Sequence, residues 1–371
     1  MDAPTLGPSI ASVEDLRTLL RMRDEPVVSI YAPQDEVTQL LKAGLHTLRK
    51  RNGSRDDAFA QIADRIRSER IDVQRSFAAE NGPPAGIACF ITPMQAIRLS
   101  LPMPVPTRLV RGEAPFLEPL LALFRPSYVV GLYLSPHGAH AFHGYGDWRR
   151  HRPIGVSPPA AMSPERSSDM SSKGPVLGWL HAVDRCLDPI LPCRHHPIVL
   201  MGMPALIEAY ASVNVHRSVI SGDPLAAGAC PDADVLYDMI TAKARDDARR
   251  RMAGDLRALR ETRTTAPKRY VDDAHTILEE AAARRVDTLF VHRARAVATA
   301  PRALARALKD APDRGGDGAH EPAPQLDVAS PDLDGRIEAA MAHTIISGGT
   351  VHEVTDAELP ATAPVTAVLR Y

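Results

Sequence analysis

The alternation of apolar and polar positions along the chain predicts many short strands. Runs of β-branched, aromatic and other apolar residues, bounded by Pro, Gly or Ser, are typical of strands. The runs that we expect to form strands are Val27–Tyr31, Gly86–Thr92, Ala96–Leu101, Tyr128–Leu134, Ala139–Gly144, Asp147–Val156, Pro197–Met201, Val286–Val291, Thr350–Val354 and Val365–Tyr371. The turn Ser135–Gly138 between two of these runs predicts the clearest hairpin in the chain.

Apolar residues three or four positions apart predict helices between these strands. Ser12, followed three positions later by Asp15, is a helix-start signal. The expected helices are one that begins after Ser12 and ends near Asp24, two within Val37–Ala79, and Pro115–Phe124, Val176–Leu191, Pro204–Ala211, Asp232–Thr262, Ile277–Ala283 and Leu333–Ile346.

Two long segments have no periodicity and are expected to be loops, Ser157–Ser172 and Asp310–Pro331. Helices that alternate with strands after a hairpin indicate an α/β sandwich, so the fold class is mixed α/β, or α+β. Breaks in the pattern near residues 122 and 266 predict three domains, 1–122, 123–265 and 266–371.

Composition and charge narrow the function classes. Lys and Arg number 44 against 45 Asp and Glu, so the net charge of −1 excludes a polybasic tail-type binder but leaves room for a local basic face. No apolar stretch approaches the ~20 residues of a membrane-spanning helix, and the first residues do not resemble a signal peptide. Four scattered cysteines without a Cys-x-x-Cys pattern indicate reduced thiols. We therefore expect a soluble, cytoplasmic protein with no membrane partner.

The common catalytic motifs are missing. The chain has no phosphate-binding loop, dinucleotide fingerprint, His-Glu-x-x-His or Gly-x-Ser-x-Gly. A two-metal nuclease needs converging carboxylates, and residues 119–146 contain no Asp or Glu. We predict no catalytic residue and no cofactor, which makes an enzyme the less favoured interpretation.

Two groups of residues suggest metal ligands. His137, His140 and His143 are three positions apart, but a strand would point the last two to opposite faces, so we expect structural histidines. The second group has no familiar zinc-ligand spacing, and we expect buried thiols and a loop histidine pair there. Its members are Cys186, Cys193, His195 and His196. No metal site is predicted.

The predicted helix Asp232–Thr262 carries the strongest local charge. The stretch Lys243–Arg263 contains eight basic and four acidic residues, a net charge of +4. Such a face either contacts RNA phosphates or is a solvated surface with ion pairs between neighbouring turns. The candidate nucleic-acid-binding residues are Lys243, Arg245, Arg249, Arg250 and Arg251, with Arg149, Arg150 and Arg152 of a shorter cluster.

The order of several motifs along nearly the whole chain resembles the bacterial branch of the archaeo-eukaryotic release factor family, the group related to Pelota. The residues that carry the resemblance are Val28–Tyr31, Phe90–Pro93, Leu101-Pro102, Pro119–Leu121, Tyr128–Val130, Ala139–Gly144, Ile277–Ala283, Val286–Val291, Gly348–Val351 and Ala367–Tyr371. The resemblance implies a variable N-terminal domain, a ribonuclease-H-like middle domain ending in the long basic helix, and a C-terminal domain like ribosomal protein L7Ae.

Release factors of this family hydrolyse peptidyl-tRNA with a Gly-Gly-Gln tripeptide on a middle-domain loop. The corresponding loop here is Ser157–Ser172, and the triplet occurs nowhere in the chain. Gly348–Thr350 lies in another domain and is interpreted as a turn. The resemblance therefore implies a non-catalytic factor of the rescue or hibernation type.

By the same resemblance, the protein would bind rRNA in the ribosomal A site, together with an elongation-factor-like GTPase. The alternative is a hydrolase or nuclease that acts on RNA or peptidyl-tRNA with catalytic residues that the sequence does not reveal. The sequence does not indicate the oligomeric state, the ligand of the N-terminal domain or the physiological trigger.

Overall fold

The structure is a computed structural model of the chain, and it describes residues 11–22, 26–33, 61–62, 85–159, 173–193, 195–215, 218–224, 231–292, 326–328, 333–359 and 363–371. The fold is mixed α/β, as predicted. The chain separates into two compact units. Unit 1 combines Met1–Leu121 with Gly254–Tyr371, and unit 2 is Ala122–Ala253. The finer division into three domains stays a prediction.

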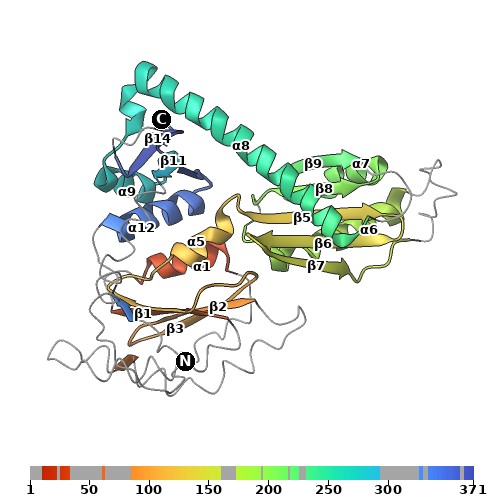
Figure 1. Cartoon of the computed structure of the whole chain (residues 1–371), viewed down its shortest axis with the longest axis horizontal. Coiled ribbons are helices and arrows are strands. Elements are labelled where there is room, and N and C mark those ends of the chain that lie inside the picture. Colours follow the sequence, from red (N-terminus) through yellow and green to blue (C-terminus); the bar gives the residue numbers. More distant parts are fainter. Residues whose placement is uncertain are drawn as a thin grey trace, which may run out of the picture. The chain divides into compact units, whose positions relative to one another are not determined.

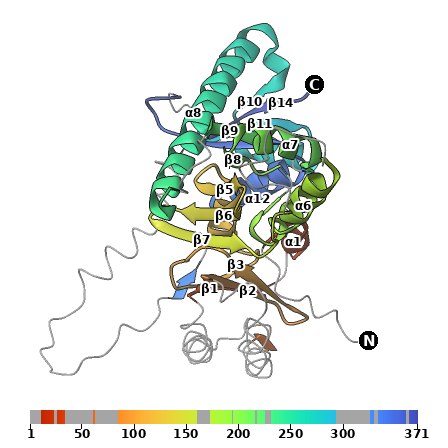
Figure 2. The ribbon, with the colours of Figure 1, turned by 90° about the vertical axis from the view of Figure 1, so that its right-hand side faces the viewer.

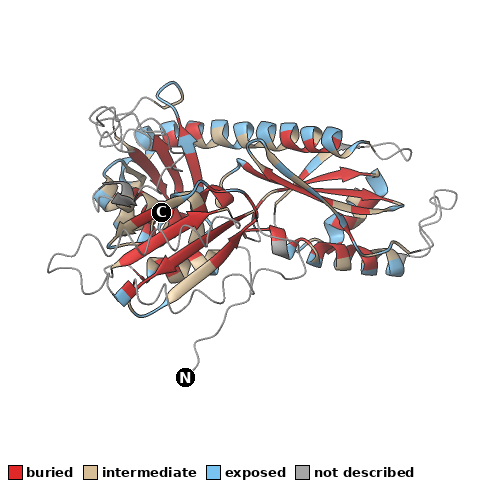
Figure 3. Ribbon diagram, turned by 60° about the horizontal axis from the view of Figure 1, so that its bottom comes forward, coloured by how far each residue is buried: buried red, intermediate tan, exposed pale blue. Residues whose placement is uncertain are grey.

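The first sheet of unit 1 has five strands in the order β12-β4-β1-β2-β3. They are β12 (Leu326–Val328), β4 (Arg108–Gly112), β1 (Val27–Ala32), β2 (Gly86–Ile91) and β3 (Ala96–Leu101). β1, β2, β3 and β4 pair antiparallel, whereas β12 pairs parallel with β4. Both β1 and β2 are buried along their whole length, which places the core of this part on the central strands (Figure 3).

The second sheet of unit 1 has four strands in the order β10-β14-β11-β13. They are β10 (Tyr270–Val271), β14 (Val365–Leu369), β11 (Val286–His292) and β13 (Thr350–Val354). β11 and β13 run parallel, and β14 pairs antiparallel with β11. The helix α9 (Ala274–Ala282) precedes β11, and Asp273 caps it by accepting a hydrogen bond from the backbone N–H of Thr276.

The helix α12 (Leu333–Ile346) joins the early and late segments of unit 1. It packs against α9, against α1 (Val13–Leu20) and against the short α5 (Glu118–Leu121) (Figure 1). The Glu338 carboxylate accepts a 2.8 Å hydrogen bond from the backbone N–H of Leu117 at the start of α5. α1 begins with the predicted capping box, in which Ser12 and Asp15 each accept a backbone N–H of the other.

Unit 2 is built on one five-stranded sheet with the order β7-β6-β5-β8-β9. Its strands are β5 (Tyr128–Ser135), β6 (Gly138–Tyr145), β7 (Trp148–Ile154), β8 (Ile198–Gly202) and β9 (Val219–Pro224). The first three form an antiparallel meander, and β8 and β9 add parallel to β5. Its helices are α6 (Lys173–Arg185), α7 (Pro204–Val213) and the first part of α8 (Ala233–Thr265).

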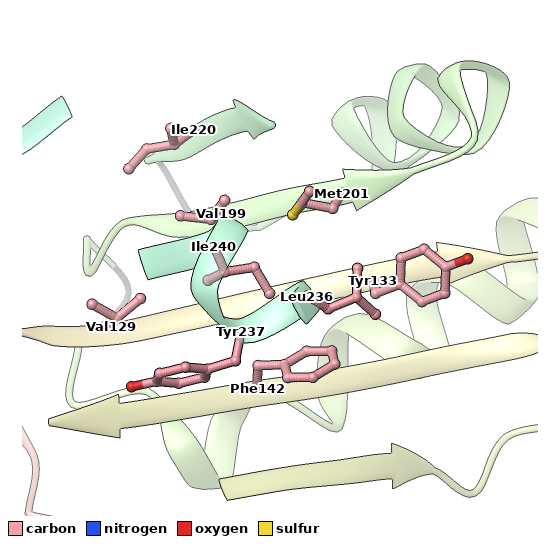
Figure 4. Close-up of a cluster of buried hydrophobic side chains, with 9 residues drawn as sticks. All are labelled: Val129, Tyr133, Phe142, Val199, Met201, Ile220, Leu236, Tyr237 and Ile240. Carbon is pink, nitrogen blue, oxygen red and sulfur yellow. The ribbon is translucent and has the colours of Figure 1, made fainter. Parts of the chain in front are cut away.

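Helices cover both faces of this sheet (Figure 2). α6 and α7 lie on one face and are linked by a 2.5 Å hydrogen bond from the buried Tyr210 hydroxyl to Asp184. On the other face, Leu236, Tyr237 and Ile240 of α8 pack into a cluster with strand side chains (Figure 4). The strand members of that cluster are Val129, Tyr133, Phe142, Val199, Met201 and Ile220.

A glycine lets α8 approach the central strand closely. A Cβ on Gly131 would lie 2.6 Å from Cδ1 and 2.7 Å from Cγ2 of Ile240, which is fully buried. Contacts that short do not occur between carbon atoms, so a side chain at position 131 would force the Ile240 side chain or the helix to shift. The sequence places this glycine in the middle of a strand for a packing reason.

Most of the predicted elements in the described residues are confirmed within a few residues at their ends. The prediction is incomplete in four places: β4, β9, β10 and β12 were not expected. β12 lies inside Asp310–Pro331, so the prediction of a continuous loop there is wrong. Most of Val37–Ala79 and of Ser157–Ser172 falls outside the described residues. No described helix is long and apolar enough to cross a membrane.

Candidate nucleic-acid interface

The arginines of α8 that the sequence singled out lie on its solvent side within unit 2. Arg249 and Arg250 have side chains that are 76% and 69% exposed, and each pairs at 3.6–3.7 Å with an aspartate one turn earlier. Arg245 is exposed and has no ion pair within the part of the chain that the structure describes. Lys243 is half-buried. The helix thus presents guanidinium groups at its surface over two turns.

Arg251 is held more firmly than its neighbours. Its guanidinium lies 2.6 Å from the Asp247 carboxylate and donates a 3.0 Å hydrogen bond to the Ser218 hydroxyl. Asp247 is only 20% exposed and also pairs with Arg250. Arg251 therefore has a structural role at the start of β9 besides any role in binding.

The ion pairs of Arg249 and Arg250 do not prevent these side chains from binding phosphate. The pair of Arg249 with Asp246 joins two exposed groups and contributes only about 0.3–0.5 kcal/mol, because water and salt screen it. Asp247 keeps Arg251 as a partner when Arg250 leaves it. A guanidinium also has five N–H donors, and a phosphate accepts two of them in a bidentate pair. Both arginines can therefore exchange an aspartate for a phosphate at little cost.

The second cluster, on β7, is split between two faces of the sheet. Arg149 lies on the α8 face, where it pairs with Asp234 at 3.3 Å and Asp238 at 3.6 Å and stacks over the Tyr237 ring. Arg150 and Arg152 lie on the opposite face, since side chains alternate along a strand. Both are close enough to the buried His143 to help lower its pKa.

The structure does not bring the two basic clusters together. β7 is one edge of the sheet, and Ser218, the partner of Arg251, precedes β9 at the other edge. Five strands about 4.8 Å apart span roughly 19 Å. The eight candidate residues therefore form at least two separate surfaces, and only the α8 group gathers several exposed arginines in one place.

The histidines form contacts that the sequence analysis missed. His140 Nδ1 lies 2.7 Å from His151 Nε2 on the neighbouring strand. His143 Nδ1 is 3.3 Å from the Tyr128 hydroxyl, and His196 Nε2 is 2.9 Å from the Tyr128 carbonyl oxygen. As expected, His140 and His143 face opposite sides of β6.

The second suspected group of metal ligands is dispersed. His196 is buried against Tyr128, while His195 is exposed. Burial raises the pKa of the Cys193 thiol. Among the described residues, no group of three or more His, Cys, Asp and Glu side chains could hold a metal ion.

Comparisons with known proteins give structural matches only. No family model matches the chain, and no curated protein matches its sequence. Saccharomyces cerevisiae Dom34, a translation termination-like factor that interacts with Hbs1, is 8% identical with a TM-score of 0.41, over 75% of this chain and 73% of its own. Ribosome-bound archaeal Pelota, with ABCE1, is 12% identical with a TM-score of 0.35, over 98% and 96%. The archaeal termination factor aRF1 is 12% identical with a TM-score of 0.23, over 98% and 99%.

These solved structures belong to the group that the sequence motifs resemble. At such identities and TM-scores, the likeness by itself assigns neither a fold to the whole chain nor an activity.

Proposed function

We propose that the protein is a non-catalytic ribosome-associated factor of the release, rescue or hibernation type. The observation that carries this proposal is the group of exposed arginines on α8, which offers bidentate donors to RNA phosphates on a chain that is otherwise close to neutral. The ribosome is proposed as the partner because the order of motifs along the chain resembles the Pelota-related family. One of the similar structures is of Pelota bound to the ribosome.

The topology of unit 2 supports the domain assignment in this proposal. Three antiparallel strands followed by two parallel ones, in the order β7-β6-β5-β8-β9 with helices on both faces, is the arrangement of ribonuclease-H-like domains. We propose such a middle domain over residues 123–265, an N-terminal domain over 1–122 and an L7Ae-like domain over 266–371. Binding in the ribosomal A site, a GTPase partner and a cytoplasmic location belong to the same proposal.

Co-sedimentation with 70S ribosomes through a sucrose gradient tests the proposal. We expect saturable migration with the ribosomes, weakening as salt rises, because arginine contacts to phosphates release counterions. Protein that stays at the top of the gradient at all salt concentrations would contradict ribosome binding. Release of the peptide from peptidyl-tRNA, or cleavage of RNA, by the purified protein alone would contradict the non-catalytic part.

A double variant tests the assigned surface. Arg249→Ala with Arg250→Ala removes two exposed arginines but leaves Arg251 and its contacts to Asp247 and Ser218 intact. Loss of two phosphate contacts should lower ribosome affinity about 30-fold near ~0.15 M salt and reduce the slope of log K against log salt by roughly 1.8. Filter binding or sedimentation across a salt series measures both quantities.

The matched control removes the same charge elsewhere. Arg21 and Arg336 are exposed arginines of unit 1, outside α8. The Arg21→Ala, Arg336→Ala protein should keep the affinity and salt slope of the wild type within about twofold. Equal losses in the two double variants would mean that net charge alone drives binding, and the α8 assignment would be wrong.

A further inference from the structure

Two imidazole rings on neighbouring strands of unit 2 point their nitrogens at each other. His140 Nδ1 and His151 Nε2 are 2.7 Å apart. The ring planes differ by 14°, and the ring centroids are 5.0 Å apart. The rings therefore lie side by side in nearly one plane, with the two nitrogens directed at each other.

The hairpin of β6 and β7 fixes this arrangement. In its register, His140 lies opposite Pro153, and Phe142 lies opposite His151, so the two histidines are diagonal neighbours on one face. The Phe142 ring stacks on His151 at 4.7 Å, and the Tyr133 ring lies 6.2 Å from His140. Aromatic side chains thus restrict both imidazoles, while His151 is exposed and His140 half-buried, which leaves the pair open to solvent.

The contact needs at least one neutral ring, because a nitrogen that accepts carries no proton. A direct hydrogen bond between two imidazole nitrogens needs one to donate a proton and the other to accept it. Neutral imidazole is the form that binds transition metals.

We propose that His140 and His151 form a two-histidine site for a divalent late-transition-metal ion, with zinc as the probe. Zn–N bonds of about 2.0–2.1 Å in a tetrahedral site place two ligand nitrogens roughly 3.3 Å apart, so the rings need to separate by ~0.6 Å and each to turn by about 35° toward the ion. The proton between them moves to the far nitrogen of its own ring, and both lone pairs then face the ion. No third His, Cys, Asp or Glu joins them among the described residues, so water completes the coordination.

The local charge permits a cation at this place. Arg149 is the nearest arginine along β7 on the same face, and Asp234 and Asp238 neutralise it. Arg150 and Arg152 point to the opposite face of the sheet. The site is separate from the arginines of α8, so the proposal is independent of ribosome binding.

Titration calorimetry of the full chain with ZnCl₂ tests the proposal, with three single variants. His140→Asn and His151→Asn each remove one ligand and should lower the affinity of one zinc equivalent about tenfold or more, because a single imidazole remains. His137→Asn, in the turn of the adjacent hairpin, is the matched control and should bind zinc like the wild type. Far-UV circular dichroism checks that each variant is folded. If only one of the two ligand variants folds, that variant is sufficient for the test.

A second probe identifies the donor atoms. The electron paramagnetic resonance spectrum of bound Cu²⁺ should show coupling to two nitrogens in the wild type and to one in His151→Asn. Zinc affinity that is unchanged in both ligand variants, or reduced equally in His137→Asn, would overturn the proposal. So would a wild-type protein that takes up no zinc at millimolar concentration.

Discussion

Replacing Gly202 by alanine should destabilise unit 2 by about 2–6 kcal/mol. Gly202 ends β8 with φ +133°, a backbone conformation that costs other residues about 1–3 kcal/mol. A Cβ there would lie 2.0 Å from the backbone oxygen of Leu134, which accepts a 3.2 Å hydrogen bond from the backbone N–H of Met203. Because the clashing atom belongs to the backbone of β5, the strands β5 and β8 must separate. This separation adds about 1–3 kcal/mol to the loss of stability.

Two alanine substitutions separate these contributions. Gly138 has a similar φ of +151° but no atom within 4 Å of a Cβ, so Gly138→Ala should show the backbone strain alone. Gly155→Ala has open space and should change stability by less than about 0.5 kcal/mol. Denaturant unfolding followed by tryptophan fluorescence measures all three, since both tryptophans, Trp148 and Trp179, lie in unit 2. A Gly202→Ala protein no less stable than Gly138→Ala would contradict the clash.

Local patterns in the sequence were sufficient to predict elements whose contacts join residues close together in the chain. The hairpin at Ser135–Gly138 and the helix cap at Ser12 depend on residues a few positions apart, and both are confirmed. β12 and β9 depend on partners far away in the chain: β12 pairs with β4 from over 200 residues away. The β9 segment contains Gly, Asp and Pro, which resemble a loop until the parallel pairing with β8 is known. β4 follows three closely spaced prolines, which favoured an extended connector instead.

The candidate site was predictable in its residues but not in its arrangement. Charge counting identified Arg249 and Arg250, and their exposure follows from the apolar stripe of the helix. Charge counting also placed Arg149 and Arg150 in one cluster, although neighbouring side chains on a strand point to opposite faces of the sheet. The contact between His140 and His151 requires the register of two strands, which spacing within one strand does not reveal.

A buried network on the α6 face of unit 2 makes its stability sensitive to acid. The Tyr128 hydroxyl donates to the Ile190 carbonyl oxygen at 2.9 Å, so His143 Nδ1 is the donor in its contact with that hydroxyl. His196 Nε2 donates to the Tyr128 carbonyl oxygen. Each ring thus uses one N–H to satisfy a buried oxygen. Burial, reinforced by Arg150 and Arg152, lowers the pKa of His143 to about 4, and burial lowers the pKa of His196 to about 4.

Lowering the pH from about 6.5 to 4 should cost unit 2 on the order of 3 kcal/mol for each of these two histidines. In that range the unfolded chain binds protons that the folded chain excludes, so stability is complete above pH 6.5 and is lost as the pH falls toward 4. The His143→Gln variant has one titrating group fewer. The slope of its unfolding free energy against pH should therefore be smaller than that of the wild type by about 1.4 kcal/mol per pH unit. Tryptophan-detected urea unfolding between pH 4 and 7.5 measures the slopes, with His275→Gln, an exposed histidine of α9, as the control that should match the wild type. Equal slopes in all three proteins would mean that His143 is not held neutral by its burial.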